Sequence, residues 1–192
     1  MESPLEVLLH VIRAFEEQKI AYVVVGSFAS SARGVPRSTL DADIVADIKP
    51  DHVKQLISSL REKFYLDEQT IRRAIETHRS FNAIHFDSAF KIDVFIPKES
   101  GISRQQLARR RLEEVAPEQG AMIYVATAED MILAKLLWYQ SGGGLSERQW
   151  ADALGMIRVQ GEQLDAVYLR EWAEGLGILD LLERILKEAM NV

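Results

Sequence analysis

A run of β-branched and aromatic residues near the N-terminus constrains the fold more than any other feature of the sequence. Residues 20–25 are Ile-Ala-Tyr-Val-Val-Val, and Gly26 follows directly. The run is apolar throughout and too short for a helix, so it predicts a strand that is buried on both faces. Such a strand belongs in a sheet covered by other elements, which favours a mixed α/β core.

The flanking sequence alternates between helical and strand periodicity. The spacing of apolar residues and the turn signals predict helices over residues 4–18, 51–60, 67–76 and 103–114, and strands over residues 42–48, 81–86, 90–96 and 122–125. The strands over 81–86 and 90–96 have the pattern of a hairpin. From Thr127 onward the spacing predicts helices alone.

The fold class expected from this order is α/β (α+β), a mixed sheet flanked by helices and followed by a helical segment. We place the boundary between residues 1–126, the core, and residues 127–192, a C-terminal helical region packed on the core. Tryptophans and tyrosines in that region are core or interface anchors by this interpretation, and a homodimer is one way to cover them.

Composition excludes several classes of protein. No apolar run approaches the ~20 residues needed to cross a bilayer, so no membrane partner is expected. The sequence contains no cysteine, which excludes disulfides and thiolate metal sites and makes the cytoplasm the default location. The net charge of −6 disfavours long nucleic acid as the main partner. A local arginine cluster, Arg104 with residues 109–111, is either a solvated helix face or a contact surface for RNA.

Two aspartates define the first candidate site. Asp41 and Asp43 lie two positions apart on a predicted strand, so their side chains point to the same face. Adjacent like charges destabilise a sheet unless a cation lies between them, and Mg²⁺ favours carboxylates together with substrate phosphates. The alternative is an exposed strand end with two solvated aspartates.

Asp93 strengthens the case for a metal site. It interrupts the apolar strand Lys91-Ile92-Asp93-Val94-Phe95-Ile96, where an aspartate is costly to bury without a partner. If this strand pairs with the strand that carries Asp41 and Asp43, the three carboxylates form the ligand set of a two-metal phosphoryl-transfer centre.

Gly26 and Ser27 supply a candidate phosphate site. They follow a buried strand and precede a helix-compatible segment, where glycine permits close approach of a ligand and free N–H groups can bind phosphate. The Ser27 hydroxyl can add a donor. By itself, the dipeptide is very common and is better explained as an ordinary strand-to-helix turn.

Three motifs together carry a resemblance to a known family: Val25-Gly26-Ser27, then residues 37–44 with the Asp-x-Asp pair, then Ile92-Asp93-Val94. In order and spacing they resemble the DNA polymerase beta-like nucleotidyltransferase superfamily, across residues 20–96. Residues 128–136 also resemble the helix that follows the core in small bacterial and archaeal members, among them toxin–antitoxin-associated branches.

The resemblance implies a role for each motif. Gly26 and Ser27 would contact the triphosphate of a nucleoside triphosphate (NTP) such as ATP, and Asp41, Asp43 and Asp93 would bind Mg²⁺ or Mn²⁺. Asp93 would also help to deprotonate the attacking hydroxyl. Two further basic residues and a threonine are candidates for nucleotide binding: Arg37, Thr39 and Lys135. Arg37 either neutralises phosphate or pairs with an aspartate, and Lys135 either contacts phosphate or lies at the edge of an amphipathic helix.

The predicted function is transfer of a nucleoside monophosphate (NMP) from an NTP to an unidentified hydroxyl, with release of pyrophosphate. Acceptors in the superfamily include RNA ends, protein hydroxyls and small antibiotics. The alternative is a non-catalytic nucleotide- or metal-binding module that regulates a partner, as an antitoxin or a sensor subunit would.

Overall fold

The computed structural model describes residues 2–26, 28–29, 41–116 and 120–190. They fall into two compact units: the first contains the β-sheet and extends to Val125, and the second contains Ala29 and the residues from Ala126 onward. The helices and strands of the first unit are α1 (Pro4–Glu17), β1 (Tyr22–Val25), β2 (Asp41–Ala46), α3 (Val53–Leu60), β3 (Phe64–Tyr65), α4 (Glu68–Thr77), β4 (Ser80–His85), β5 (Lys91–Phe95), α5 (Ile102–Arg109), β6 (Arg111–Ala116) and β7 (Ala121–Val125). A short 3-10 turn, Pro50–His52, leads into α3.

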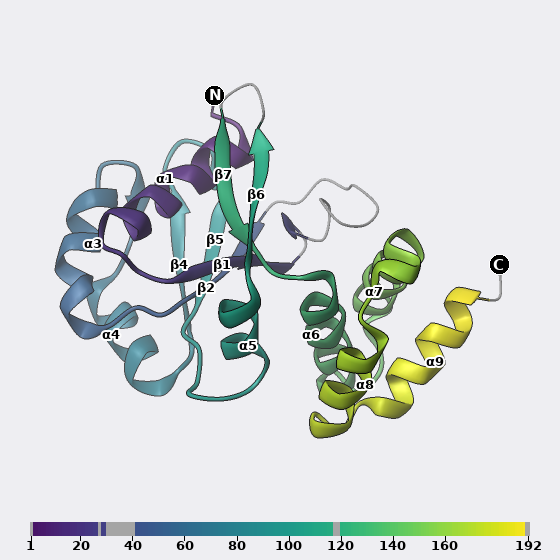
Figure 1. Ribbon diagram of the computed structural model, residues 1–192. Coiled ribbons are helices and arrows are strands. Elements are labelled where there is room, and N and C mark those ends of the chain that lie inside the picture. Colours follow the sequence, from purple (N-terminus) through teal and green to yellow (C-terminus); the bar gives the residue numbers. More distant parts are fainter. Residues whose placement is uncertain (1, 27, 30–40, 117–119, 191–192) are drawn as a thin grey trace. The chain divides into compact units, whose positions relative to one another are not determined.

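The sheet of the first unit is mixed, as its sequence predicts (Figure 1). Its described strands are ordered β3-β4-β5-β2-β1-β7-β6. β1 pairs antiparallel with β2 and parallel with β7, while β2 pairs parallel with β5. β1 therefore lies inside the sheet, and all four of its residues are buried, which confirms the prediction from its apolar run. β4 and β5 form the predicted antiparallel hairpin.

α1 begins where the sequence predicts and is held at its first turn by reciprocal capping. The backbone N–H of Ser3 donates to Glu6 Oε2 over 2.7 Å, and the backbone N–H of Glu6 donates to Ser3 Oγ over 3.3 Å. The buried face of the helix contains Leu8, Ile12 and Phe15. α1 packs against α3, and α3 packs against α4.

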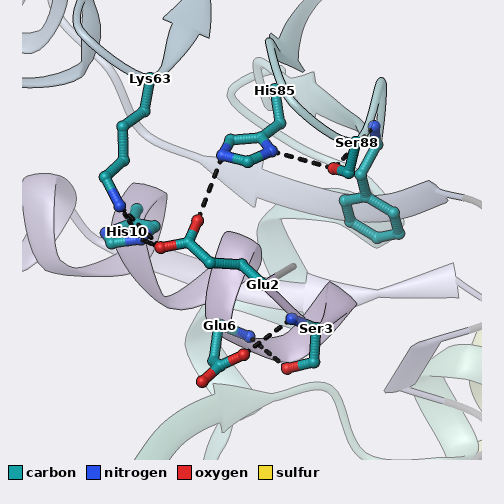
Figure 2. A network of polar contacts seen from close by, with 8 residues as sticks. Glu2, Ser3, Glu6, His10, Lys63, His85 and Ser88 are labelled. Carbon is teal, nitrogen blue, oxygen red and sulfur yellow. Dashed lines mark hydrogen bonds and ion pairs between the residues drawn. The ribbon is translucent and has the colours of Figure 1, made fainter.

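Glu2 joins the segment before α1 to the region around β3 and β4 (Figure 2). One carboxylate oxygen of Glu2 accepts from Lys63 Nζ at 2.7 Å and lies 3.1 Å from His10 Nε2. The other lies 3.2 Å from Nε2 of His85, a buried residue whose Nδ1 is 2.9 Å from Ser88 Oγ. The Lys63 hydrogen bond is the main cause that lowers the pKa of Glu2 to about 2, followed by the bond to His10.

The helix predicted over residues 103–114 is wrong in its second half. α5 ends at Arg109, and residues 111–116 form β6, an edge strand that pairs with β7. The segment Arg-Leu-Glu-Glu-Val-Ala has a neutral preference on its own, and the backbone partners offered by β7 decide for the strand. The arginine cluster is consequently divided among a helix, its end and a strand. Arg104 pairs with Asp47 at 3.2 Å, and the Arg110 guanidinium lies 4.7 Å from the ring centre of Tyr124.

The second unit is helical, as the sequence predicts from Thr127 onward. Its helices are α6 (Ala128–Ser141), α7 (Glu147–Gln160), α8 (Ala166–Gly175) and α9 (Leu179–Met190), with a short 3-10 turn at Gly161–Gln163. α6 contacts α7, α8 and α9, so it forms the centre of this unit. Thr127 caps α6 by accepting from the backbone N–H of Asp130. In the described part of the chain, no helix has the length and hydropathy of a membrane span.

Candidate active site

The parallel pairing of β2 with β5 brings the predicted aspartates to one place. Asp43 lies directly opposite Asp93 in the register, and Asp41 lies opposite Lys91. Alternate residues on these strands, among them Ala42, Ile44, Ile92 and Val94, are buried on the opposite face. Because side chains alternate along a strand, Asp41, Asp43 and Asp93 all lie on the less buried face of the sheet.

Gly26 lies at the end of β1 and closes one side of this group. Val25, the residue before it, is paired with Asp43. Gly26 has a φ of +67°, a conformation that residues with a side chain rarely adopt. A Cβ atom at this position would lie 1.9 Å from Asp43 Oδ2, so the carboxylate occupies the space that any side chain would need. Backbone conformation and close approach both require glycine here.

Asp93 contacts two neighbours on its own side of the sheet. Its Oδ2 is 2.7 Å from Lys91 Nζ. Asn82 is its partner on β4, and with the amide oriented to satisfy both of its ends, the Asn82 nitrogen donates to Asp93 Oδ1 over 2.5 Å. Hydrogen bonds from a cation and an amide stabilise the charged form of the carboxylate.

Sequence reasoning did not single out Lys91 or Asn82. Lys91 could have been found from the sequence, because a residue two positions before Asp93 on a strand shares its face. Asn82 could not, since its place beside Asp93 depends on the register of β4 against β5.

The donor set fits a hard divalent cation. Three carboxylates lie on one face with no thiolate or imidazole among them, and oxygen ligands are those that Mg²⁺ and Mn²⁺ prefer. The Lys91 ammonium already provides a positive charge to this group. Among the residues that the structure describes, no cluster of three or more His, Asp or Glu side chains has the geometry of a metal-binding site.

Four candidates from the sequence remain: Ser27, Arg37, Thr39 and Lys135. Ser27, Arg37 and Thr39 are outside the described residues. Lys135 lies on α6 in the second unit, where it is 5% exposed and its Nζ donates to Asp152 Oδ2 over 2.9 Å. Near it on the same helix, the fully buried Asp130 accepts a hydrogen bond from the Tyr168 hydroxyl. The structure thus brings together Gly26, Asp41, Asp43 and Asp93 in the first unit.

Comparison with known proteins identifies the architecture. No family model matches the chain, and a comparison with curated proteins also gave no match. Solved structures do resemble it. An antigenic nucleotidyltransferase-like protein from Paracoccidioides brasiliensis matches with a TM-score of 0.55 and 18% identity, over 94% of this chain and 91% of that protein.

Two further structures agree with this match. ANT(2'')-Ia in complex with adenylyl-2''-tobramycin has a TM-score of 0.51 and 14% identity, over 93% of this chain and 95% of its own. A candidate nucleotidyltransferase from Thermotoga maritima has a TM-score of 0.50 and 19% identity, over 79% and 96%. At these identities the likeness concerns the fold. The chain has the fold of these nucleotidyltransferase structures, in agreement with the fold class expected from the sequence.

Proposed function

We propose that the protein is a metal-dependent nucleotidyltransferase that moves an NMP from an NTP to a hydroxyl acceptor and releases pyrophosphate. The observation that carries the proposal is the register of β2 and β5, which sets Asp43 beside Asp93 on the face shared with Asp41. Gly26 adds support because its backbone must remain bare next to Asp43. A fold scaffold alone would require neither three carboxylates on one face nor a glycine against one of them.

Each residue of the site has a task in this reaction. Gly26, with Ser27, would bind the triphosphate through backbone N–H groups, and Asp41, Asp43 and Asp93 would hold the cations. Bound divalent ions would offset the negative charge that develops on the α-phosphate and on pyrophosphate. Asp93 accepts the proton of the attacking hydroxyl. The acceptor oxygen forms a bond to the α-phosphorus as the bond from that phosphorus to the bridging oxygen of pyrophosphate breaks.

Three other residues are assigned to nucleotide binding as part of the same proposal. Arg37 and Thr39 precede the Asp-x-Asp pair in sequence, at positions suited to phosphate contacts. Lys135 is the third, and its pairing with Asp152 means that a contact with phosphate requires exchange of that partner. We place the reaction in the cytoplasm, where Mg²⁺ and NTPs are abundant.

The acceptor belongs to one of three classes: a small molecule, a protein hydroxyl or an RNA end. The net charge of −6 favours a small cationic acceptor over a long polyanion. ANT(2'')-Ia, one of the proteins with this fold, was solved with an adenylylated antibiotic, adenylyl-2''-tobramycin. Cationic amino sugars therefore form the first acceptor set to test.

The experiment is incubation with each of the four NTPs, labelled on the α-phosphate, in the presence of Mg²⁺ or Mn²⁺. Pools of amino sugars, proteins and RNA serve as acceptors, and both product label and pyrophosphate are measured. The proposal predicts acceptor-dependent release of pyrophosphate that is lost in Asp43→Asn and retained in Asp87→Asn. Asp87 is an exposed aspartate in the β4–β5 turn and serves as the matched control.

A regulatory module gives a different result in the same assay. It would bind NTP with the same affinity with and without acceptor, and no pool would yield pyrophosphate. That outcome, with a folded wild-type protein, contradicts the enzymatic proposal.

A further inference from the structure

Lys91 is the one charged residue of β5 besides Asp93, and it shares the face of the three carboxylates. It lies two positions before Asp93 on the strand and directly opposite Asp41 in the pairing with β2. Its Nζ is 2.7 Å from Asp93 Oδ2. The Lys91 ammonium therefore lies beside Asp93 at a position where the proposed function would put a metal ion.

All three aspartates act on this lysine. The hydrogen bond to Asp93 is the main cause that raises the pKa of Lys91. Burial opposes the rise, while the negative charges of Asp93, Asp41 and Asp43 add to it. Lys91 is thus bound to one carboxylate and attracted by the other two, which makes it the counter-ion of the whole group.

The pair is accessible enough to exchange its partner. The Lys91 side chain is 40% exposed and that of Asp93 is 17% exposed. By contrast, the side chain of Lys135 in its pair with Asp152 is only 6% exposed. A lysine holds its charge on a flexible four-carbon stem, so the Lys91 ammonium can leave Asp93 for solvent at modest cost.

We propose that Lys91 is a resident counter-ion that occupies the carboxylate group when no metal is bound and competes with divalent cations for it. This inference rests on the proposed function, since it assumes that the same aspartates bind metal. Lys91 lowers the affinity for metal in exchange for a stable metal-free protein. It is accordingly a residue that sets the metal concentration at which the site fills.

A titration with Mn²⁺ alone tests directly whether Lys91 competes with the ion. Binding is monitored in electron paramagnetic resonance as the loss of the free Mn²⁺ signal. Lys91→Met should bind Mn²⁺ about tenfold more tightly than the wild type, because a positive charge close to the ion has been removed. Lys98→Met is the matched control, since it removes the same charge from an exposed lysine beyond the end of β5 and should leave the affinity unchanged.

Thermal unfolding gives a second readout. Without metal, Lys91→Met should melt at a lower temperature than the wild type, because its carboxylates repel one another without a counter-ion. Mn²⁺ should then raise the Tm of Lys91→Met by more than it raises that of the wild type. A lysine that only packs on the strand would lower the Tm and leave the Mn²⁺ affinity as it was.

The outcomes separate the two proposals. If the wild type binds Mn²⁺ through Asp43, and Lys91→Met and Lys91→Gln bind it equally or more weakly, the competition is contradicted and the metal site stands. If neither the wild type nor the Lys91 variants bind Mn²⁺ in a manner that depends on Asp43, the proposed function fails, and this inference fails with it. Lys91→Gln keeps a polar side chain and provides a folded variant should Lys91→Met aggregate.

Discussion

At the scale of single residues, the candidate site depends both on the missing side chain at Gly26 and on the hydrogen-bond donors around Asp93. Gly26 has no side chain, and the carboxylate of Asp43 on β2 occupies the space that a side chain at Gly26 would need. Lys91 and Asn82 supply donors to Asp93 on a face that also carries Asp41 and Asp43. The candidate site therefore comprises one glycine and two polar side chains in addition to the three aspartates.

Gly26→Ala tests the residue-scale account of the turn. The variant must adopt a left-handed backbone conformation, which costs about 1 kcal/mol, and must also displace the Asp43 carboxylate. We expect a larger loss in the free energy of unfolding, measured with urea, than in Gly120→Ala. Gly120 has a similar φ of +60°, and among the described residues no atom beyond its chain neighbours lies within 4 Å of the position that a Cβ would take. Gly120→Ala therefore has only the cost of the left-handed backbone conformation. Equal losses in the two variants would contradict the close approach of Asp43.

At the scale of elements, the strands that carry the site were predictable and their neighbours were less so. The run that became β1 predicts its strand because it is short, β-branched and apolar throughout. The segments that became β4 and β5 predict theirs because apolar and polar positions alternate with period two. The pairing of β2 with β5 was a condition in the sequence argument, and it depends on contacts between segments that lie far apart in the chain. β6 was missed because its strand character comes from β7, and β3 because two residues show no period.

Glu2 provides an element-scale test through pH. Its pKa is lowered from 4.5 to about 2, chiefly by the hydrogen bond from Lys63 and then by His10. A lowered pKa contributes stability that is present above 4.5 and is lost as the pH falls through 4.5 toward 2. Glu2→Gln should therefore be less stable than the wild type at neutral pH, and the difference should shrink across that window. Urea unfolding at a series of pH values measures it, and a difference independent of pH would contradict the account.

The ion pair between Lys135 on α6 and Asp152 on α7 provides a second element-scale test. Asp152→Asn removes the carboxylate that pairs with Lys135, whose side chain is 6% exposed, and should lower the free energy of unfolding by up to about 3 kcal/mol. The double variant Lys135→Met with Asp152→Leu removes both charges and should recover most of that loss. If Lys135 serves mainly to bind phosphate, Lys135→Met with Asp152→Leu will be as stable as the wild type but will have a raised KM for NTP.

At the scale of the whole molecule, stability and function oppose each other at the site. Asp41 and Asp43, two positions apart on β2, and Asp93, opposite Asp43 on β5, place three negative charges on one face of the sheet, where like charges destabilise the pairing of strands. The candidate set Asp41, Asp43 and Asp93 was predictable because residue type and spacing specify it. Ser27, Arg37 and Thr39 lie outside the described residues and stay predictions, and Lys135 stays one because no observation here tests its contact with phosphate.

The repulsion among the three aspartates has a measurable consequence for stability. Asp43→Asn removes one of the repelling charges, so in the absence of metal it should unfold at the same free energy as the wild type or be more stable by about 0.5 kcal/mol. The same variant should have no transfer activity. A large loss of stability in Asp43→Asn would instead assign this aspartate a structural role.

The most direct test of the account is the number of Mn²⁺ ions that bind per chain in the presence of a nonhydrolysable NTP analogue. The proposed function predicts about two ions for the wild type, with Asp41 and Asp43 as ligands of both ions and Asp93 as a ligand of one. Asp93→Asn should bind about one ion and Asp87→Asn about two. If Asp93→Asn binds as many ions as the wild type, the three carboxylates do not form a shared metal centre, and the central claim is contradicted.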